Sequence, residues 1–128
     1  MVFRLLFLIV LCGLTAFLAV APGSYSPLAP LVNDWAPWID HRDAVILAHL
    51  VGFGGLVVMV TWLWGRLLHA TLAVFAFSAV LEAVQTRIAW RDGSWSDLGL
   101  NAVAVLLGIL VVWALRRLGW MPSIGRGS

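Results

Sequence analysis

The chain has 128 residues, of which 62% are hydrophobic and 11% are charged, and its mean hydropathy is +1.00. This composition excludes an ordinary soluble domain, because soluble domains carry about 25% charged residues. The net charge of +2 results from eight arginines, with no lysine, and six acidic residues, and so few basic residues do not form a nucleic-acid-binding surface. The single Cys12 excludes an intrachain disulfide and a cysteine-based metal site. The sequence therefore predicts one membrane domain over residues 1–128, surrounded mainly by lipid.

Four apolar stretches are long enough to cross about 30 Å of hydrocarbon as helices. They cover approximately residues 5–21, 44–64, 67–86 and 97–115. Short connections place neighbouring helices antiparallel. We therefore expect an all-α polytopic membrane protein with a four-helix up-down bundle.

The first stretch also has features of a secretory signal peptide. A basic start and an apolar run are followed by Ala19-Val20-Ala21, a candidate cleavage site. Pro22 directly after this site argues against cleavage, and the apolar run is at the long end for a signal. We expect residues 5–21 to be retained as a membrane span.

A long connection, residues 22–43, separates the first two stretches and contains Trp35 and Trp38 beside acidic side chains. Tryptophan prefers the boundary between hydrocarbon and water, so this composition predicts a segment lying at the level of the lipid headgroups. The remaining tryptophans lie at or near predicted span ends. We expect all eight to act as interfacial anchors: Trp35, Trp38, Trp62, Trp64, Trp90, Trp95, Trp113 and Trp120.

The arginines predict the orientation, because short cytoplasmic loops carry an excess of basic residues. One side of the predicted bundle would hold Arg4, Arg66, Arg116, Arg117 and Arg126. The other side would hold Arg42, Arg87 and Arg91. This bias predicts a multi-pass protein of the bacterial inner membrane with both termini in the cytoplasm.

Polar side chains gather at the predicted outer end of the bundle. A charged residue at the centre of a span costs about 2.5–3.5 kcal/mol, so Glu82 inside the third stretch requires an explanation. Gln85 lies on the same helical face, and Asp97 and Asn101 share a face of the fourth stretch. The start of the second stretch lies at the same depth. We define the polar cluster as His49, Glu82, Gln85, Arg91, Asp97 and Asn101.

Two interpretations of the polar cluster stay open, because the guanidinium of Arg91 can bind a carboxylate or a phosphate. In the structural interpretation, Arg91 pairs with Glu82 or Asp97, and Gln85 and Asn101 form hydrogen bonds across helices. In the functional interpretation, the cluster receives a lipid headgroup or a glycan phosphate. A lone histidine without a second histidine or cysteine at ligand spacing does not indicate a metal, so we expect neither metal nor cofactor.

Small residues also indicate close helix packing. Ala48, Gly52 and Gly55 are expected on one face of the second stretch, and Ala104 and Gly108 on one face of the fourth. Small side chains at such positions allow the backbones of membrane helices to approach closely.

Five polar positions of the third and fourth stretches resemble the signature of the VanZ-like family of small bacterial membrane proteins, with the spacing Glu82-x2-Gln85-x5-Arg91-x5-Asp97-x3-Asn101. His49, followed four residues later by Phe53, is similar to that family's second-helix motif. The resemblance covers approximately residues 40–110. The family takes its name from a member associated with low-level resistance to the glycopeptide teicoplanin. The resemblance therefore implies a function at the cell envelope linked to glycopeptide resistance, without a defined reaction.

Three classes of function stay open. The first is a non-enzymatic protein that binds or shields an envelope lipid or glycan intermediate, with membrane lipids as its partners. The second is an accessory or scaffold subunit of a larger membrane complex, suggested by small size and little extramembrane mass. The third is a polyprenyl-phosphate-acting enzyme with Glu82 or His49 as general base. This third class is less favoured, because the sequence shows no nucleophile, metal-ligand set or phosphate-binding glycine motif.

Overall fold

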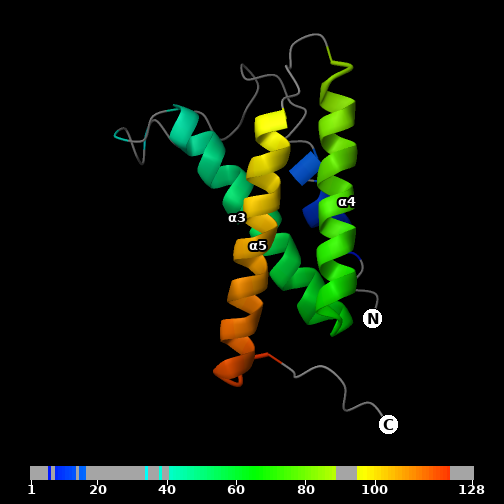
Figure 1. Cartoon of the computed structure of the whole chain (residues 1–128), viewed down its shortest axis with the longest axis vertical. Helices are drawn as coiled ribbons and strands as arrows, with labels where there is room; N and C mark the ends of the chain where they lie inside the picture. Colours follow the sequence, from blue (N-terminus) through cyan, green and yellow to red (C-terminus); the bar gives the residue numbers. More distant parts are fainter. Residues whose placement is uncertain are drawn as a thin grey trace.

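The computed structural model describes residues 6, 8–13, 15–16, 34, 38, 41–88 and 95–121. Three long helices follow one another in this part of the chain: α3 (His41–Trp64), α4 (Leu67–Gln85) and α5 (Trp95–Arg117) (Figure 1). Their 24, 19 and 23 residues correspond to lengths of about 36, 28 and 34 Å at 1.5 Å per residue. All three are long and apolar enough to cross a membrane, as expected for a multi-pass membrane protein.

The last three predicted spans are confirmed as helices of membrane-spanning length, with small differences at their ends. The helix α3 begins three residues before the predicted start at residue 44, and α5 extends the predicted 97–115 by two residues at each end. The described residues between 6 and 16 are also helical, and the Thr15 hydroxyl donates a hydrogen bond to the Leu11 carbonyl at 2.8 Å. The remainder of the predicted first span and most of the predicted interfacial segment lie outside the described residues.

Local signals explain where these helices begin and end. Asp43 and Asp97 lie in the first turns of α3 and α5, where a carboxylate complements the positive end of the helix dipole. Gly65 ends α3 with a φ of +70°, a left-handed conformation that glycine adopts without the steric cost of a Cβ atom. Its amide donates to the Thr61 carbonyl at 2.7 Å. The chain can therefore reverse between α3 and α4 within two residues.

The helix α3 packs most extensively against α5, and it crosses behind α5 obliquely in the view of Figure 1. Gly54 and Gly108 meet at this crossing. A Cβ atom placed on Gly108 would lie 2.7 Å from the Gly54 carbonyl oxygen, and one placed on Gly54 would lie 3.0 Å from the Ala104 carbonyl oxygen. The predicted contact face of α5, formed by Ala104 and Gly108, is therefore confirmed.

The contact face predicted for α3 is wrong. Ala48 and Gly55 are exposed, and a Cβ atom added to Gly52 or Gly55 would meet no atom within 4 Å. The face that contacts α5 is centred on Gly54 instead. The reason is that α3 is apolar around its whole circumference, so that its sequence carries no polar stripe to identify the buried side.

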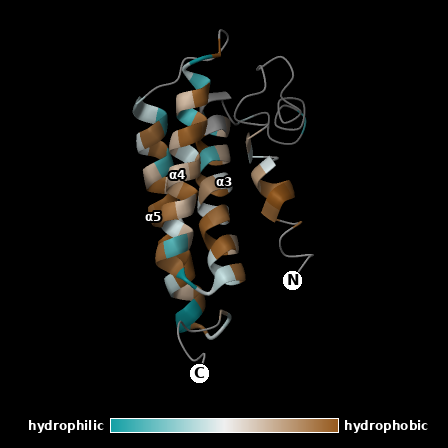
Figure 2. Ribbon diagram, turned by 90° about the vertical axis from the view of Figure 1, so that its right-hand side faces the viewer, coloured by the Kyte–Doolittle hydropathy of each residue, from teal (hydrophilic) through white to brown (hydrophobic). Residues whose placement is uncertain are grey.

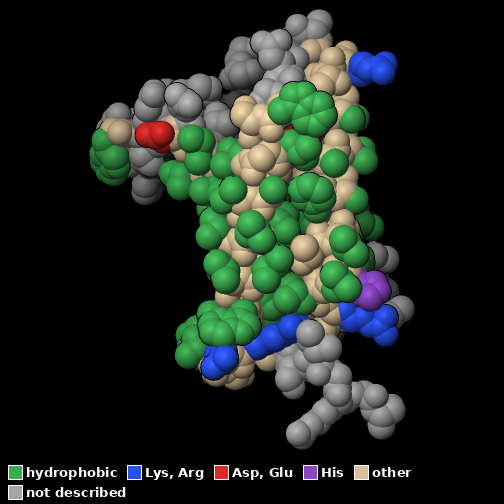
Figure 3. All heavy atoms as spheres, in the orientation of Figure 1, with side chains coloured by type: hydrophobic (Ala, Val, Ile, Leu, Met, Phe, Trp, Pro, Cys, Tyr) green, Lys and Arg blue, Asp and Glu red, His purple; other side chains and the backbone are tan. Residues whose placement is uncertain are grey.

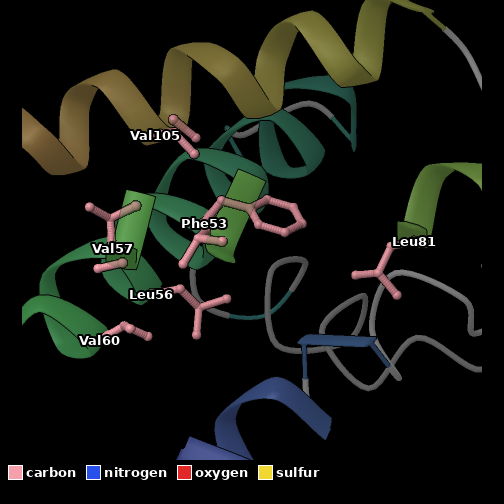
Figure 4. Close-up of a cluster of buried hydrophobic side chains, with 9 residues drawn as sticks. Phe53, Leu56, Val57, Val60, Leu81 and Val105 are labelled. Carbon is pink, nitrogen blue, oxygen red and sulfur yellow. The ribbon is translucent and has the colours of Figure 1, made fainter. Parts of the chain in front are cut away.

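Buried aliphatic side chains of α3 form the centre of the packing. Phe53, Leu56, Val57 and Val60 belong to a cluster that also includes Val105 of α5, which lies over α3 in Figure 4. Described residues of the N-terminal helical segment pack against this cluster. These are Leu8, Leu11, Cys12 and Ala16.

Large apolar side chains also cover the outside of the helices. Apolar colours dominate the middle of the three helices in Figure 2, and hydrophobic side chains cover the middle of the face in Figure 3. Leu72, Leu106 and Leu110 are each 60% exposed. Lipid tails are as apolar as leucine, so these side chains suit a surface that faces hydrocarbon.

The two ends of the helices differ in charge. The end formed by the α3–α4 turn and the last turn of α5 carries Arg66, Arg116 and Arg117, and arginine side chains line the lower edge of the molecule in Figure 3. We call this the basic end. The opposite end is formed by the first turns of α3 and α5 and the last turn of α4. We call it the polar end, because Glu82 and Asp97 lie there.

Candidate functional site

A hydrogen bond between His49 and Asn101 links α3 to α5 near the polar end. His49 Nδ1 lies 2.7 Å from Asn101 Oδ1. Asn101 is 2% exposed, whereas His49 is only partly buried. The two side chains come from the third turn of α3 and the second turn of α5, which run in the same direction from the polar end. The crossing of the two helices therefore brings together residues that are 52 positions apart in the chain.

Phe53 supports the histidine ring from one turn further along α3. The ring centroids of His49 and Phe53 are 5.9 Å apart, and the ring planes are tilted by 42°. Phe53 is itself buried in the apolar cluster. The His49–Phe53 spacing thus places a fixed apolar ring beside the imidazole, which restricts the movement of the imidazole on that side.

The last turn of α4 contributes Glu82 and Gln85 to the same end of the bundle. Gln85 is 5% exposed, and Glu82 is half-buried. In the first turn of α5, Asp97 is also half-buried. Buried or half-buried polar groups near the end of an apolar bundle require hydrogen-bond or charge partners. All three residues do take part in polar or other specific interactions.

The polar cluster is thus divided in the structure. His49 and Asn101 are in direct contact, and Glu82, Gln85 and Asp97 occupy the same end of the helices. Arg91, which the structural interpretation pairs with Glu82 or Asp97, lies outside the described residues. The described cluster therefore contains neutral hydrogen-bonding side chains and two acidic ones.

The described tryptophans lie near helix ends and are exposed. Trp62 and Trp64 end α3, Trp95 begins α5, and Trp113 and Trp120 lie near the C-terminal end of α5. Trp38 is also exposed, and Trp35 and Trp90 lie outside the described residues. Trp113 stacks under the guanidinium of Arg117, whose Cζ atom is 4.4 Å from the ring centroid. Such positions suit the interfacial role that the sequence predicts.

The chemistry available at the polar end is hydrogen bonding and acid–base chemistry. Among the described residues, no group of three or more histidine, cysteine, aspartate or glutamate side chains is arranged to hold a metal ion. A histidine held by a neighbouring amide can accept or transfer a proton at its second nitrogen. The carboxylates of Glu82 and Asp97 accept hydrogen bonds when they are ionised.

Sequence reasoning did not predict the specific pairing of His49 with Asn101. Both residues were expected at one depth, and Asn101 was expected to form a hydrogen bond across helices, but the partner depends on the crossing at Gly54 and Gly108. The polar core position Ser78 was also missed. Its hydroxyl donates to the Phe75 carbonyl at 2.8 Å within α4. The hydroxyl therefore needs no partner on another helix, and the spacing of polar residues along the sequence does not indicate that Ser78 is buried.

The comparisons with known proteins identify no relative of this chain. Neither the models of protein families, nor the curated proteins, nor the solved structures give a match.

Proposed function

We propose that this chain is a membrane protein that binds the polar headgroup of an envelope lipid or glycan intermediate at the polar end of α3, α4 and α5. The observation that carries the proposal is the hydrogen bond between His49 and the buried Asn101, with Gln85 also buried at the same end. Polar groups inside a membrane domain are costly, and their common functions are helix association and ligand binding. The incomplete burial of His49 favours ligand binding here, because part of this residue stays accessible.

The distribution of charge supports an orientation for this site. Arg66, Arg116 and Arg117 share the basic end, which we assign to the cytoplasmic side of a bacterial inner membrane. The polar end then faces the outer leaflet, where cell-wall intermediates are used. In this orientation the N-terminus and the C-terminus are both cytoplasmic if the predicted first span crosses the membrane.

The resemblance to the VanZ-like family leads to a narrower form of the proposal. In that form the protein is VanZ-like and reduces sensitivity to teicoplanin-type glycopeptides by binding or shielding an envelope intermediate. The support is the spacing of the polar cluster along α4 and α5, together with the contact that His49 makes with Phe53. The proposed activity is binding without turnover.

The test is lipid association of the purified full-length protein, measured by native mass spectrometry of bound envelope lipids. Alanine at Glu82, Arg91 and Asp97 should abolish the association while the helical content stays that of the wild type. Arg87→Ala is the matched control, because Arg87 is an exposed arginine just beyond α4. Association that is unchanged in the triple variant would contradict the proposal. Recovery of one stoichiometric protein partner instead of lipid would favour an accessory subunit.

A further inference from the structure

The hydrogen bond to Asn101 determines which nitrogen of His49 carries the proton. Asn101 Oδ1 is a carbonyl oxygen and only accepts hydrogen bonds. His49 Nδ1, 2.7 Å away, must therefore be the donor. In the neutral form of the ring, which has one N–H group and one lone pair, an Nδ1 donor leaves the lone pair at Nε2.

The surroundings of His49 hold the ring in this arrangement. Asn101 is buried and sits on α5, and Phe53 is buried beside the ring on α3. The close approach of Gly54 and Gly108 fixes the two helices to each other about one to two turns away. Nδ1 thus points toward the buried amide, while the residue keeps part of its surface exposed.

We propose that His49 Nε2 accepts a hydrogen bond from a hydroxyl group of the bound headgroup, and that Asn101 is the positioning residue that keeps Nε2 unprotonated. This inference rests on the proposed binding function and adds the chemistry that the site selects. A phosphodiester has only acceptor oxygens, so it cannot donate to the lone pair at Nε2. A sugar or glycerol headgroup offers hydroxyl donors. The site therefore prefers hydroxyl-bearing headgroups to bare phosphodiesters.

The acidic residues at the polar end are consistent with this preference. Glu82 and Asp97 lie half-buried in the last turn of α4 and the first turn of α5. A carboxylate accepts hydrogen bonds when it is ionised. A headgroup that offers hydroxyl donors therefore suits these two acceptors.

A matched pair of lipids tests the preference. Phosphatidylglycerol and phosphatidylmethanol carry the same phosphodiester charge, but only the first has hydroxyl groups beyond the phosphate. Native mass spectrometry of the full-length protein with each lipid should give a dissociation constant about 3- to 10-fold lower for phosphatidylglycerol, the range expected for one hydrogen bond. A glycosyl diacylglycerol, which has sugar hydroxyls and no phosphate, identifies the source of the hydroxyl. Binding of this lipid shows that a sugar hydroxyl is sufficient, and its failure to bind restricts the proposal to glycerol phosphate headgroups.

Variants separate a positioning role from a purely structural one. His49→Phe and Asn101→Leu should abolish the preference for phosphatidylglycerol. Asn101→Asp should abolish it too, because a carboxylate beside Nδ1 favours a doubly protonated ring, whose Nε2–H group donates to the phosphate that both lipids share. His69→Phe is the matched control, since His69 is exposed in the first turn of α4 at the basic end. This control should keep the wild-type preference.

The ¹⁵N spectrum of the imidazole groups gives a readout that does not depend on lipid binding. The signal lost in His49→Phe should show a proton on Nδ1, and assignment of the proton to Nε2 would overturn the inference. Equal affinity of the wild type for both lipids would overturn it as well. If lipid still binds and remains sensitive to Glu82 and Asp97, the proposed function survives that result. A wild-type protein that binds none of the three lipids overturns this inference, whereas the proposed function is decided by its own test with bound envelope lipids.

Discussion

Substituting alanine for Gly108 should weaken the crossing of α3 and α5 more than the same substitution elsewhere on α5. The new Cβ atom would lie 2.7 Å from the Gly54 carbonyl oxygen and 2.8 Å from Val57 Cβ. Ordinary van der Waals contacts begin near 3.4 Å, so both neighbours must move by about 0.6–0.7 Å. Both lie on α3, and one is a backbone atom, so the helices have to separate.

The expected cost follows from this overlap. Overpacking of a close-packed contact typically costs about 1–3 kcal/mol. Alanine also favours the helix by about 0.8–1.0 kcal/mol relative to glycine, which partly offsets the cost. Gly99→Ala provides a matched control on the same helix, because a Cβ atom there would meet no atom within 4 Å. Both variants gain the same helix propensity from alanine, so the difference between them is the cost of overpacking. Gly108→Ala should therefore be less stable than Gly99→Ala by about 1–3 kcal/mol.

The assay is reversible unfolding in mixed micelles, in which sodium dodecyl sulfate is titrated into dodecyl maltoside and helical content is followed by circular dichroism. Gly54→Ala should lie between the two variants, since its Cβ atom would be 3.0 Å from the Ala104 carbonyl oxygen. Equal free energies of unfolding for Gly108→Ala and Gly99→Ala would refute the packing described for α3 and α5.

Four further variants test the core, the turn and the orientation. Leu56→Ala should lower the free energy of unfolding by about 2–5 kcal/mol in the same assay, because Leu56 is 1% exposed. Leu106→Ala, at a position that is 60% exposed, should change it by less than about 1 kcal/mol, and equal losses would contradict the assignment of core and lipid faces. Gly65→Ala should cost about 1–2 kcal/mol because of its φ of +70°, and a neutral effect would mean that the turn has another backbone conformation. Replacing Arg116 and Arg117 with glutamine should lower the fluorescence of a C-terminal cytoplasmic reporter, whereas an unchanged signal would argue against orientation by these charges.

The helices could be predicted from the sequence because the membrane imposes simple requirements. A span needs about 20 apolar residues, and every backbone group must be paired within the helix. Charged residues such as Asp43, Arg66 and Arg117 therefore mark the approximate ends of α3, α4 and α5. Polarity alone does not locate a helix end to the residue, because helix ends fray. The helices α3 and α5 therefore extend two or three residues beyond the predicted bounds.

The packing faces could not be predicted in the same way. In a soluble helix, a polar stripe identifies the exposed side, whereas here leucines such as Leu106 and Leu110 face outward and valines such as Val57 face inward. The choice of Gly54 over Gly55 depends on how α5 approaches α3, and this is a tertiary property.

The candidate site, like the fold, could be predicted from the sequence only in part. Spacing placed Glu82, Gln85, Asp97 and Asn101 at one end of the bundle, because the period of the α-helix and the up-down order are sufficient for that inference. The contact between His49 and Asn101 needs the relative position of two crossing helices. Spacing along one helix contains no information about that position, so only the structure gives the pairing of His49 with Asn101.

The most direct test of the central claim is a structure of the full-length protein in a bilayer with its native lipid retained. We expect a headgroup at the polar end, with a hydroxyl group within about 2.5–3.2 Å of His49 Nε2, while Nδ1 keeps its hydrogen bond to Asn101. A polar end without lipid, in which Arg91 pairs with Glu82 or Asp97 and Nε2 is bonded within the protein, would contradict the claim. The polar cluster would then serve only to hold the helices together.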